Sequence, residues 1–208
     1  MRSAEFGAGS ESRPAHSALR IPRSAFAAMP ALDHLAGLFY SNLAELGTFE
    51  EVLAENMPEP YRTLLAHHEH MTVSVERHHA AKVEVEVLAA KRSGDYYFRK
   101  ILLHRQSDQR VVLFGIPRLN LRLIDDEVRR EIFSESKPLG RVLIEHNVLR
   151  EVQLGSLYRV TSGPDLCRLF GLIEPQLTYG RTAFIYCDGF VAIELLEIVA
   201  PEYGKMAE

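Results

Sequence analysis

The sequence has no tryptophan and only two cysteines, Cys167 and Cys187, among its 208 residues. Two cysteines are too few for a disulfide scaffold, and neither belongs to a Cys-x-x-Cys or Cys/His zinc pattern. We therefore interpret them as buried thiols. No apolar run approaches the roughly 20 residues that a membrane helix needs, and the N-terminus lacks a signal-peptide pattern. We expect a cytoplasmic protein that does not contact a membrane.

A surplus of positive charge is also missing. Lys and Arg number 24 against 28 Asp and Glu, which gives a formal net charge of −4. Without a long basic run, nucleic acid is not an expected partner. The length suits one domain with a tail. Residues 1–30, which show no sustained apolar period, are predicted to be a disordered tail, and residues 31–208 a single domain. The sequence leaves a monomer and a homodimer both open.

The apolar pattern predicts helices first and then mostly strands. Residues 32–46 have helical spacing, residues 48–51 indicate a second helix start, and residues 58–66 a short third helix. Residues 71–77 and 82–88 alternate between apolar and polar, which predicts two half-solvated antiparallel strands. The other expected elements are strands over residues 96–106, 110–121 and 148–161 and helices over residues 125–133, from Pro138 onward, and over 164–170.

Five histidines flank the strand predicted over residues 71–77, namely His67, His68, His70, His78 and His79. They form no HExxH motif. The strand between the two groups is about 7 residues long, and at about 3.3 Å per residue it separates them too far for one ion. We therefore expect a polar rim and neither a metal nor another cofactor.

Residues 178–201 contain two β-rich runs joined at Asp188-Gly189, which predicts a tight hairpin. Both faces of the second strand are mainly apolar, and each carries one carboxylate, Glu197 on one face and Glu194 on the other. A buried carboxylate must be neutral or paired with a cation, because an unpaired buried charge costs several kcal/mol or more. Unless the carboxylates lie at an exposed rim, a basic residue elsewhere should pair with one of them.

The strands predicted over residues 96–106 and 110–121 each carry an arginine that is a candidate for binding an anion, Arg99 and Arg118. If Asp108-Gln109 is a two-residue turn, Arg99 lies directly opposite Arg118 on one face. Opposed like charges are destabilising, so an anion between them would explain the arrangement. Alternatively, both arginines are solvated or form ion pairs with acidic neighbours. Pro117 has no amide donor and indicates an edge or a bulge, which could shift the register.

Residues 64–201 resemble the chorismate lyase family (chorismate pyruvate-lyase, the 4-hydroxybenzoate synthase), whose fold also occurs in ligand-sensing domains of certain GntR-type regulators. Four segments in this order carry the resemblance: Leu64-Leu65 followed by Met71-Thr72; the strand Tyr97-Phe98-Arg99-Lys100-Ile101-Leu102-Leu103; the helix start Pro138-Leu139-Gly140-Arg141; and the Asp188-Gly189 hairpin with Glu197 before Pro201. The resemblance implies an α+β fold, in which helices pack on a single antiparallel β-sheet and cover a buried ligand pocket.

The resemblance also implies a reaction, the elimination of pyruvate from chorismate to leave 4-hydroxybenzoate. In that family a strand arginine and a leucine amide hold the ring carboxylate, and a glutamate near the chain's end meets the ring hydroxyl; these positions match Arg99, Leu139 and Glu197. The family's second arginine directly follows a glycine, whereas Ile116 follows Gly115 here. The register above would place Arg118 in that role.

We therefore expect Arg99, Arg118, Leu139 and Gly140 to bind the substrate, and Glu197 with Arg99 to form the catalytic set. The free amides of Leu139 and Gly140 at a helix start suit an anion. The expected partner is an aromatic or cyclohexadiene carboxylic acid. Two alternatives remain open: a non-catalytic aromatic-acid binding module, and a lyase or isomerase acting on a related enolpyruvyl or cyclohexadiene acid.

Overall fold

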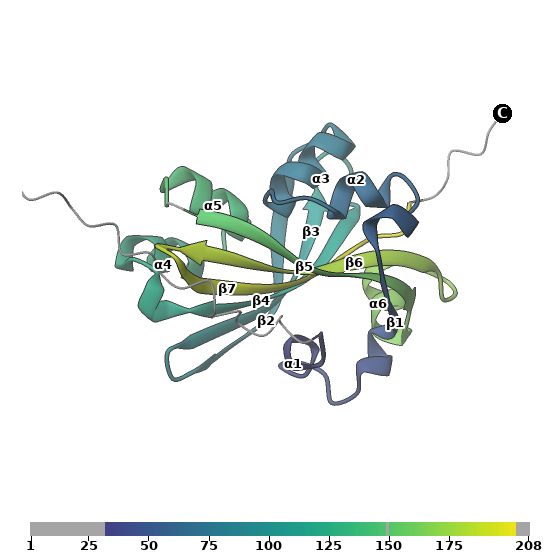
Figure 1. The fold of residues 1–208 in the computed structure, drawn as a ribbon, viewed down its shortest axis with the longest axis horizontal. Coiled ribbons are helices and arrows are strands. Elements are labelled where there is room, and N and C mark those ends of the chain that lie inside the picture. The colour runs from purple at the N-terminus through teal and green to yellow at the C-terminus, as the bar shows by residue number, and fades with distance from the viewer. Residues whose placement is uncertain (1–31, 149, 203–208) are drawn as a thin grey trace, which may run out of the picture.

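The computed structural model describes residues 32–148 and 150–202, so that the tail predicted over residues 1–30 lies outside the described residues. Seven strands form one antiparallel sheet in the order β1-β5-β6-β7-β4-β3-β2 (Figure 1). The strands are β1 (Gly47–Val52), β2 (Val83–Ser93), β3 (Tyr96–Arg105), β4 (Val111–Asn120), β5 (Arg150–Ser162), β6 (Leu177–Cys187) and β7 (Phe190–Val199). The helices are α1 (Leu32–Ala36), α2 (Tyr61–Leu65), α3 (Met71–His79), α4 (Asp126–Phe133), α5 (Leu139–Glu145) and α6 (Pro164–Phe170), with the 3₁₀ turns η1 (Leu43–Glu45), η2 (Ala54–Asn56) and η3 (Leu121–Leu123).

Helices cover both faces of the sheet, which confirms the predicted α+β architecture. Helices α2, α3, α4 and α5 pack on one face, and α1 and α6 on the other (Figure 1). The central strands alternate between the two cores; in β4, for example, Leu113 belongs to one core and Phe114 to the other. None of the helices in the described part of the chain is long and apolar enough to span a membrane.

The hairpin between β6 and β7 forms as predicted. Asp188 and Gly189 have φ angles of 50° and 81°, and Cys187 lies opposite Phe190. Two consecutive positive φ angles are the requirement of a type I′ turn, which matches the right-handed twist of the strands that it joins. Both faces of β7 are buried, since Leu195 and Leu196 belong to cores on opposite sides of the sheet.

The prediction of a strand over residues 71–77 is wrong, because this segment is the helix α3. One face of this helix holds its buried residues, Met71, Thr72, Ser74 and Val75. The same short segment therefore fits both the helical period and the alternation of a strand. The helix ends at Ala80, which is in the left-handed conformation, with φ 49°. Basic side chains in the last turn favour that end through the helix dipole.

Two predictions near the N-terminus are also corrected. Residues 48–51 do not start a helix but belong to β1, which pairs with β5 at the edge of the sheet. The single helix predicted over residues 32–46 is divided into α1 and η1. The side chain of Asn42 accepts a hydrogen bond from the Ala44 amide and so begins η1 as a separate turn.

Candidate functional site

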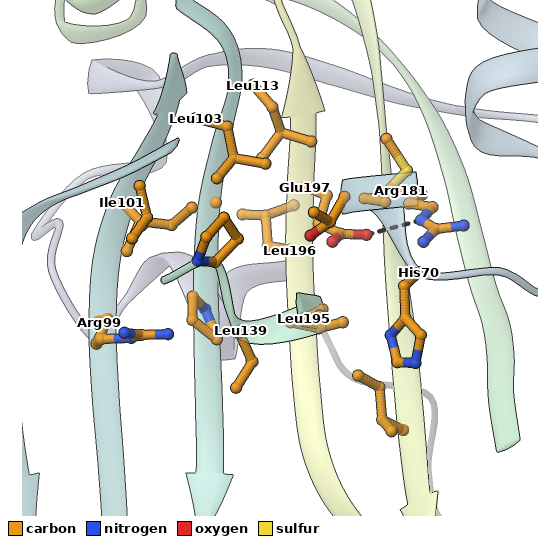
Figure 2. A pocket seen from close by; sticks show the side chains of 18 of the residues that line it. His70, Arg99, Ile101, Leu103, Leu113, Leu139, Arg181, Leu195, Leu196 and Glu197 are labelled. Atoms are coloured by element: carbon orange, nitrogen blue, oxygen red, sulfur yellow. Dashed lines mark hydrogen bonds and ion pairs between the residues drawn. The ribbon is translucent and has the colours of Figure 1, made fainter. Parts of the chain in front are cut away.

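Three charged side chains are buried in the described part of the chain, and all three line the same pocket. They are Arg99 on β3, Arg181 on β6 and Glu197 on β7, which are 1%, 0% and 8% exposed. The pocket lies between the sheet and the first residues of α3 and α5 (Figure 2). Its volume is about 570 Å³, including solvent at its mouth. Burying charge is costly, so the concentration of buried charges here marks the candidate site.

Strand β4 forms a low floor for this pocket. Its pocket-facing row contains Gly115 and Pro117, which are flanked by Ile101 on β3 and Leu195 on β7. A glycine and a proline project less side chain than the leucines and isoleucines of the neighbouring strands. The space above β4 therefore remains open while the walls are apolar.

Glu197 is paired with a cation, as its position in an apolar row requires. Its Oε2 accepts a hydrogen bond from Arg181 Nε at 2.8 Å. The two residues are register partners on adjacent antiparallel strands. Arg181 was not predicted as a site residue, although it is the only basic residue in the hairpin over residues 178–201. A bulge between Ile185 and Tyr186 shifts the register by one residue and brings Arg181, in place of Gly180, opposite Glu197.

Arg181 also fastens the segment that joins α2 to α3. Its Nη1 donates to the carbonyl oxygens of Leu65 at 3.2 Å and His67 at 3.0 Å, and its Nη2 donates to the Glu69 carbonyl at 3.1 Å. One guanidinium therefore binds both the Glu197 carboxylate and three backbone carbonyls. These contacts use four of its five N–H donors.

The His67 ring is held in its neutral form by this arrangement. Its Nε2 lies 2.6 Å from the Leu64 carbonyl, which assigns the proton to Nε2, and its Nδ1 accepts from the Glu69 amide at 3.1 Å. Arg181 Nη1 lies 3.3 Å from the same Nδ1. Burial, and then the charge of Arg181, lower the pKa of His67 below its ordinary value.

Arg99 differs from Arg181 because it is buried with almost no partner. Its Nη1 makes one long contact of 3.4 Å with the Ile132 carbonyl, and its Nε has no hydrogen-bond partner. No carboxylate in residues 32–148 or 150–202 forms an ion pair with it, and the nearby Glu135 instead accepts from the Tyr97 hydroxyl at 2.8 Å. Burial lowers the pKa of Arg99. In Figure 2, Arg99 and Glu197 lie on opposite sides of the pocket.

Leu139 and Gly140 line the pocket from the side opposite the sheet, at the start of α5. The residue before them, Pro138, has no side chain that could cap the helix. Gly140 is packed closely against α3: a Cβ atom at this position would lie 2.8 Å from Thr72 Oγ1. The glycine thus lets α5 and α3 meet over the pocket.

The expectation that Arg118 faces Arg99 is wrong. The connection between β3 and β4 is longer than two residues, because the Arg105 amide donates to the Arg110 carbonyl, and a bulge lies between Leu103 and His104. Arg118 is therefore opposite Phe98 and points to the other face of the sheet. There it forms an ion pair with Glu194 at 2.7 Å and lies over the ring of Tyr96.

The site is therefore a partly apolar, net cationic pocket within a single-sheet α+β domain. No known protein family and no curated protein matches the sequence. Three solved structures that resemble the fold are the ligand-binding domain of a protein described as a GntR-family transcriptional regulator from Bordetella bronchiseptica, PhnF from Mycobacterium smegmatis, and a GntR-family transcriptional regulator from Bacillus cereus.

These likenesses are distant. The sequence identities are 14%, 10% and 12% and the TM-scores 0.43, 0.45 and 0.41, in the same order. The matches cover 58%, 65% and 61% of this chain and 87%, 69% and 99% of the other chains.

Proposed function

We propose that this protein binds a small, ring-bearing monocarboxylic acid in the pocket between the sheet and helices α3 and α5. The observation that carries the proposal is Arg99, a guanidinium that is 1% exposed and has one long hydrogen bond. A buried cation without an anion is unfavourable, and a ligand carboxylate would supply charge-assisted hydrogen bonds to it.

The charges around the pocket favour one carboxylate rather than two. Arg99 and Arg181 contribute two positive charges and Glu197 one negative charge, so the three buried groups sum to +1. A monoanion brings this sum to zero, whereas a dianion would leave an excess negative charge in an apolar site. Four of the five N–H donors of Arg181 are used by Glu197 and by backbone carbonyls, so that one Nη2 hydrogen at most is left and Arg181 cannot hold a second carboxylate through two hydrogen bonds.

The separation of Arg99 and Glu197 suits a ring with polar groups at both ends. On β3, Arg99 is two residues from Ile101. Ile101 pairs with Gly115 on β4, and Gly115 pairs with Glu197 on β7, so Arg99 and Glu197 are two strands and two residues apart. With strands about 4.8 Å apart and a rise of about 3.3 Å per residue, their Cα atoms are roughly 12 Å apart. The side chains occupy part of this distance. In the proposed complex a six-membered ring occupies the remainder, with its carboxylate at Arg99 and a hydroxyl or amine donating to Glu197.

A binding panel tests the proposal. Titration calorimetry is expected to show that 4-hydroxybenzoate binds more tightly than benzoate, and that the neutral 4-hydroxybenzamide binds far more weakly than either. Arg99→Met should abolish the preference for the acid over the amide. Arg118→Ala is the matched control, because it removes an arginine from the other face of the sheet. Equal affinities for acid and amide in the unmodified protein would contradict the proposal.

A lyase acting on chorismate is the second candidate, because Glu197 points into the same pocket as Arg99 (Figure 2). Such a carboxylate could help remove the ring proton beside the hydroxyl while aromatisation drives the loss of pyruvate. Chorismate carries two carboxylates, however, and Arg118 is not available for the second.

The two candidates are separated by incubating the protein with chorismate and measuring pyruvate. Release of pyruvate that is strongly reduced in Glu197→Gln, with chorismate binding retained, would support the lyase. Binding of 4-hydroxybenzoate without any pyruvate would support the binding module. A mass-spectrometric scan of products from related enolpyruvyl and cyclohexadiene acids would detect a different lyase or isomerase.

A further inference from the structure

A second cluster of polar side chains lies away from the pocket, where α3 ends and the chain leaves β7. His78 and His79 are the last residues of α3, and Glu202 is three residues beyond β7. The Nε2 atoms of His78 and His79 lie 3.1 Å and 4.0 Å from Glu202 Oε1. One ligand atom from each residue lies within 4.8 Å of the other two.

This separation is close to what a metal ion requires. Zinc binds imidazole nitrogen at about 2.0–2.1 Å and carboxylate oxygen at about 2.0–2.2 Å, so ligands of one tetrahedral ion are a little more than 3 Å apart. Movement of the side chains by about an ångström would bring the three ligand atoms, which now lie within 4.8 Å of one another, to this spacing. Two imidazoles and one carboxylate are also a ligand set that zinc uses when other positions are left open.

The three groups are held in place by their surroundings. The backbone amide of Glu202 donates to the Tyr61 hydroxyl at 2.8 Å, which anchors the segment after β7 to α2. Ala80, in the left-handed conformation, ends the helix directly after the two histidines.

The arrangement differs from the other histidine–glutamate pairs of the described chain. His104 lies 2.6 Å from Glu86, and His146 likewise contacts Glu131. Neither of these pairs belongs to a three-residue group of potential ligands within the described residues. A hydrogen bond needs only two groups, so the second imidazole at Glu202 is the feature that indicates an ion.

We propose that His78, His79 and Glu202 bind a divalent transition-metal ion of the zinc type. The ion would join the end of α3 to the segment after β7. The first residues of α3 line the pocket, and β7 carries Glu197. The ion would therefore hold α3, which covers the pocket, to the segment that follows β7. Arg105 and Arg110 line the same hollow as His79 and Glu202, and their positive charge limits the affinity.

Zinc titration of the full chain, freed of metal with a chelator, tests the proposal. The expected result is one Zn²⁺ per chain and a higher unfolding temperature with zinc. His79→Ala and Glu202→Gln should each weaken binding by at least the roughly 10–100-fold that loss of a supporting residue costs a metal site. His104→Ala, at a pair without a third ligand, should leave it unchanged.

Cobalt gives an independent measurement. Bound Co²⁺ should show a visible absorption spectrum that is lost in His79→Ala. The proposal is overturned if the unmodified protein binds no zinc, or if His79→Ala and Glu202→Gln bind it as well as the unmodified protein does. Unfolding in urea verifies that each variant is folded, which is expected because His78 is exposed and the other two side chains are only partly buried.

Discussion

Replacing Arg99 by methionine is expected to change stability and ligand affinity in opposite directions. In the ligand-free protein, Arg99 has one contact of 3.4 Å and an Nε without a partner. Methionine would fill much of the same volume without a buried charge. Removal of an uncompensated buried cation should therefore stabilise the fold, while ligands lose the group that binds their carboxylate.

The magnitudes follow from the contacts. Exchanging buried charged groups for apolar ones of similar volume stabilises proteins by about 1–4 kcal/mol in the documented cases. The lost hydrogen bond offsets this by about 1 kcal/mol, which leaves a gain of roughly 0–3 kcal/mol. For a domain of this size, each kcal/mol raises the unfolding temperature by about 2–4 °C. A charge-assisted hydrogen bond to a ligand is worth about 1.5–3 kcal/mol, or roughly 10–150-fold in Kd.

Arg181→Met is the matched control, since it removes the other buried arginine. Arg181 is bonded to Glu197 and to three carbonyls, so its loss leaves a buried carboxylate unpaired. Breaking such a pair costs about 3–5 kcal/mol. Urea unfolding without ligand, and calorimetry with 4-hydroxybenzoate, measure both effects. If Arg99→Met destabilises the protein as Arg181→Met does, Arg99 has a folded-state partner and the reasoning fails.

Three further predictions concern the cover and the faces of the sheet. The His67 pKa lies below its ordinary 6.5, so the folded protein binds a proton at this ring less readily than the unfolded chain and loses stability as the pH falls. His67→Gln should therefore reduce the drop in urea midpoint between about pH 7.5 and about 5.5. Arg118→Ala should leave 4-hydroxybenzoate affinity unchanged by calorimetry and cost at most about 1 kcal/mol, since its ion pair with Glu194 is part-exposed. Gly140→Ala should cost about 1–3 kcal/mol in urea unfolding and weaken ligand binding, because the new methyl group meets Thr72 over the pocket.

Local chemistry predicted the elements that have strong turn or cap signals. The type I′ turn at Asp188-Gly189 and the helix α6 between Pro164 and Gly171 follow from φ preferences that are properties of single residues. Residues 71–77 carried no such signal. The helix that they form packs against α5, where Thr72 meets Gly140, and that contact involves residues far apart in the chain.

The register of the strands limited the prediction of the site. The sequence indicated Arg99 and Glu197, and the structure places both at one pocket. A bulge contributed to both errors, the misplacement of Arg118 and the omission of Arg181, because it adds one residue to one strand and exchanges the faces of the residues beyond it relative to the partner strand. For Arg118, the longer connection between β3 and β4 also changed the register. Alternation of polarity fixes which residues share a face within a strand, but it does not locate a bulge between strands.

The low floor on β4 gives this pocket a simple means of changing its ligand. Gly115 does not have a positive φ angle, so its backbone could be adopted by another residue. A Cβ atom there would meet Cδ1 and Cγ1 of Ile101 at 3.2 Å and 3.3 Å, so that the Ile101 side chain would have to shift by a few tenths of an ångström. A single substitution could therefore shorten the chamber by one methyl group and leave both charged walls intact, so that ring size and charge recognition can diverge separately in descendants of this chain.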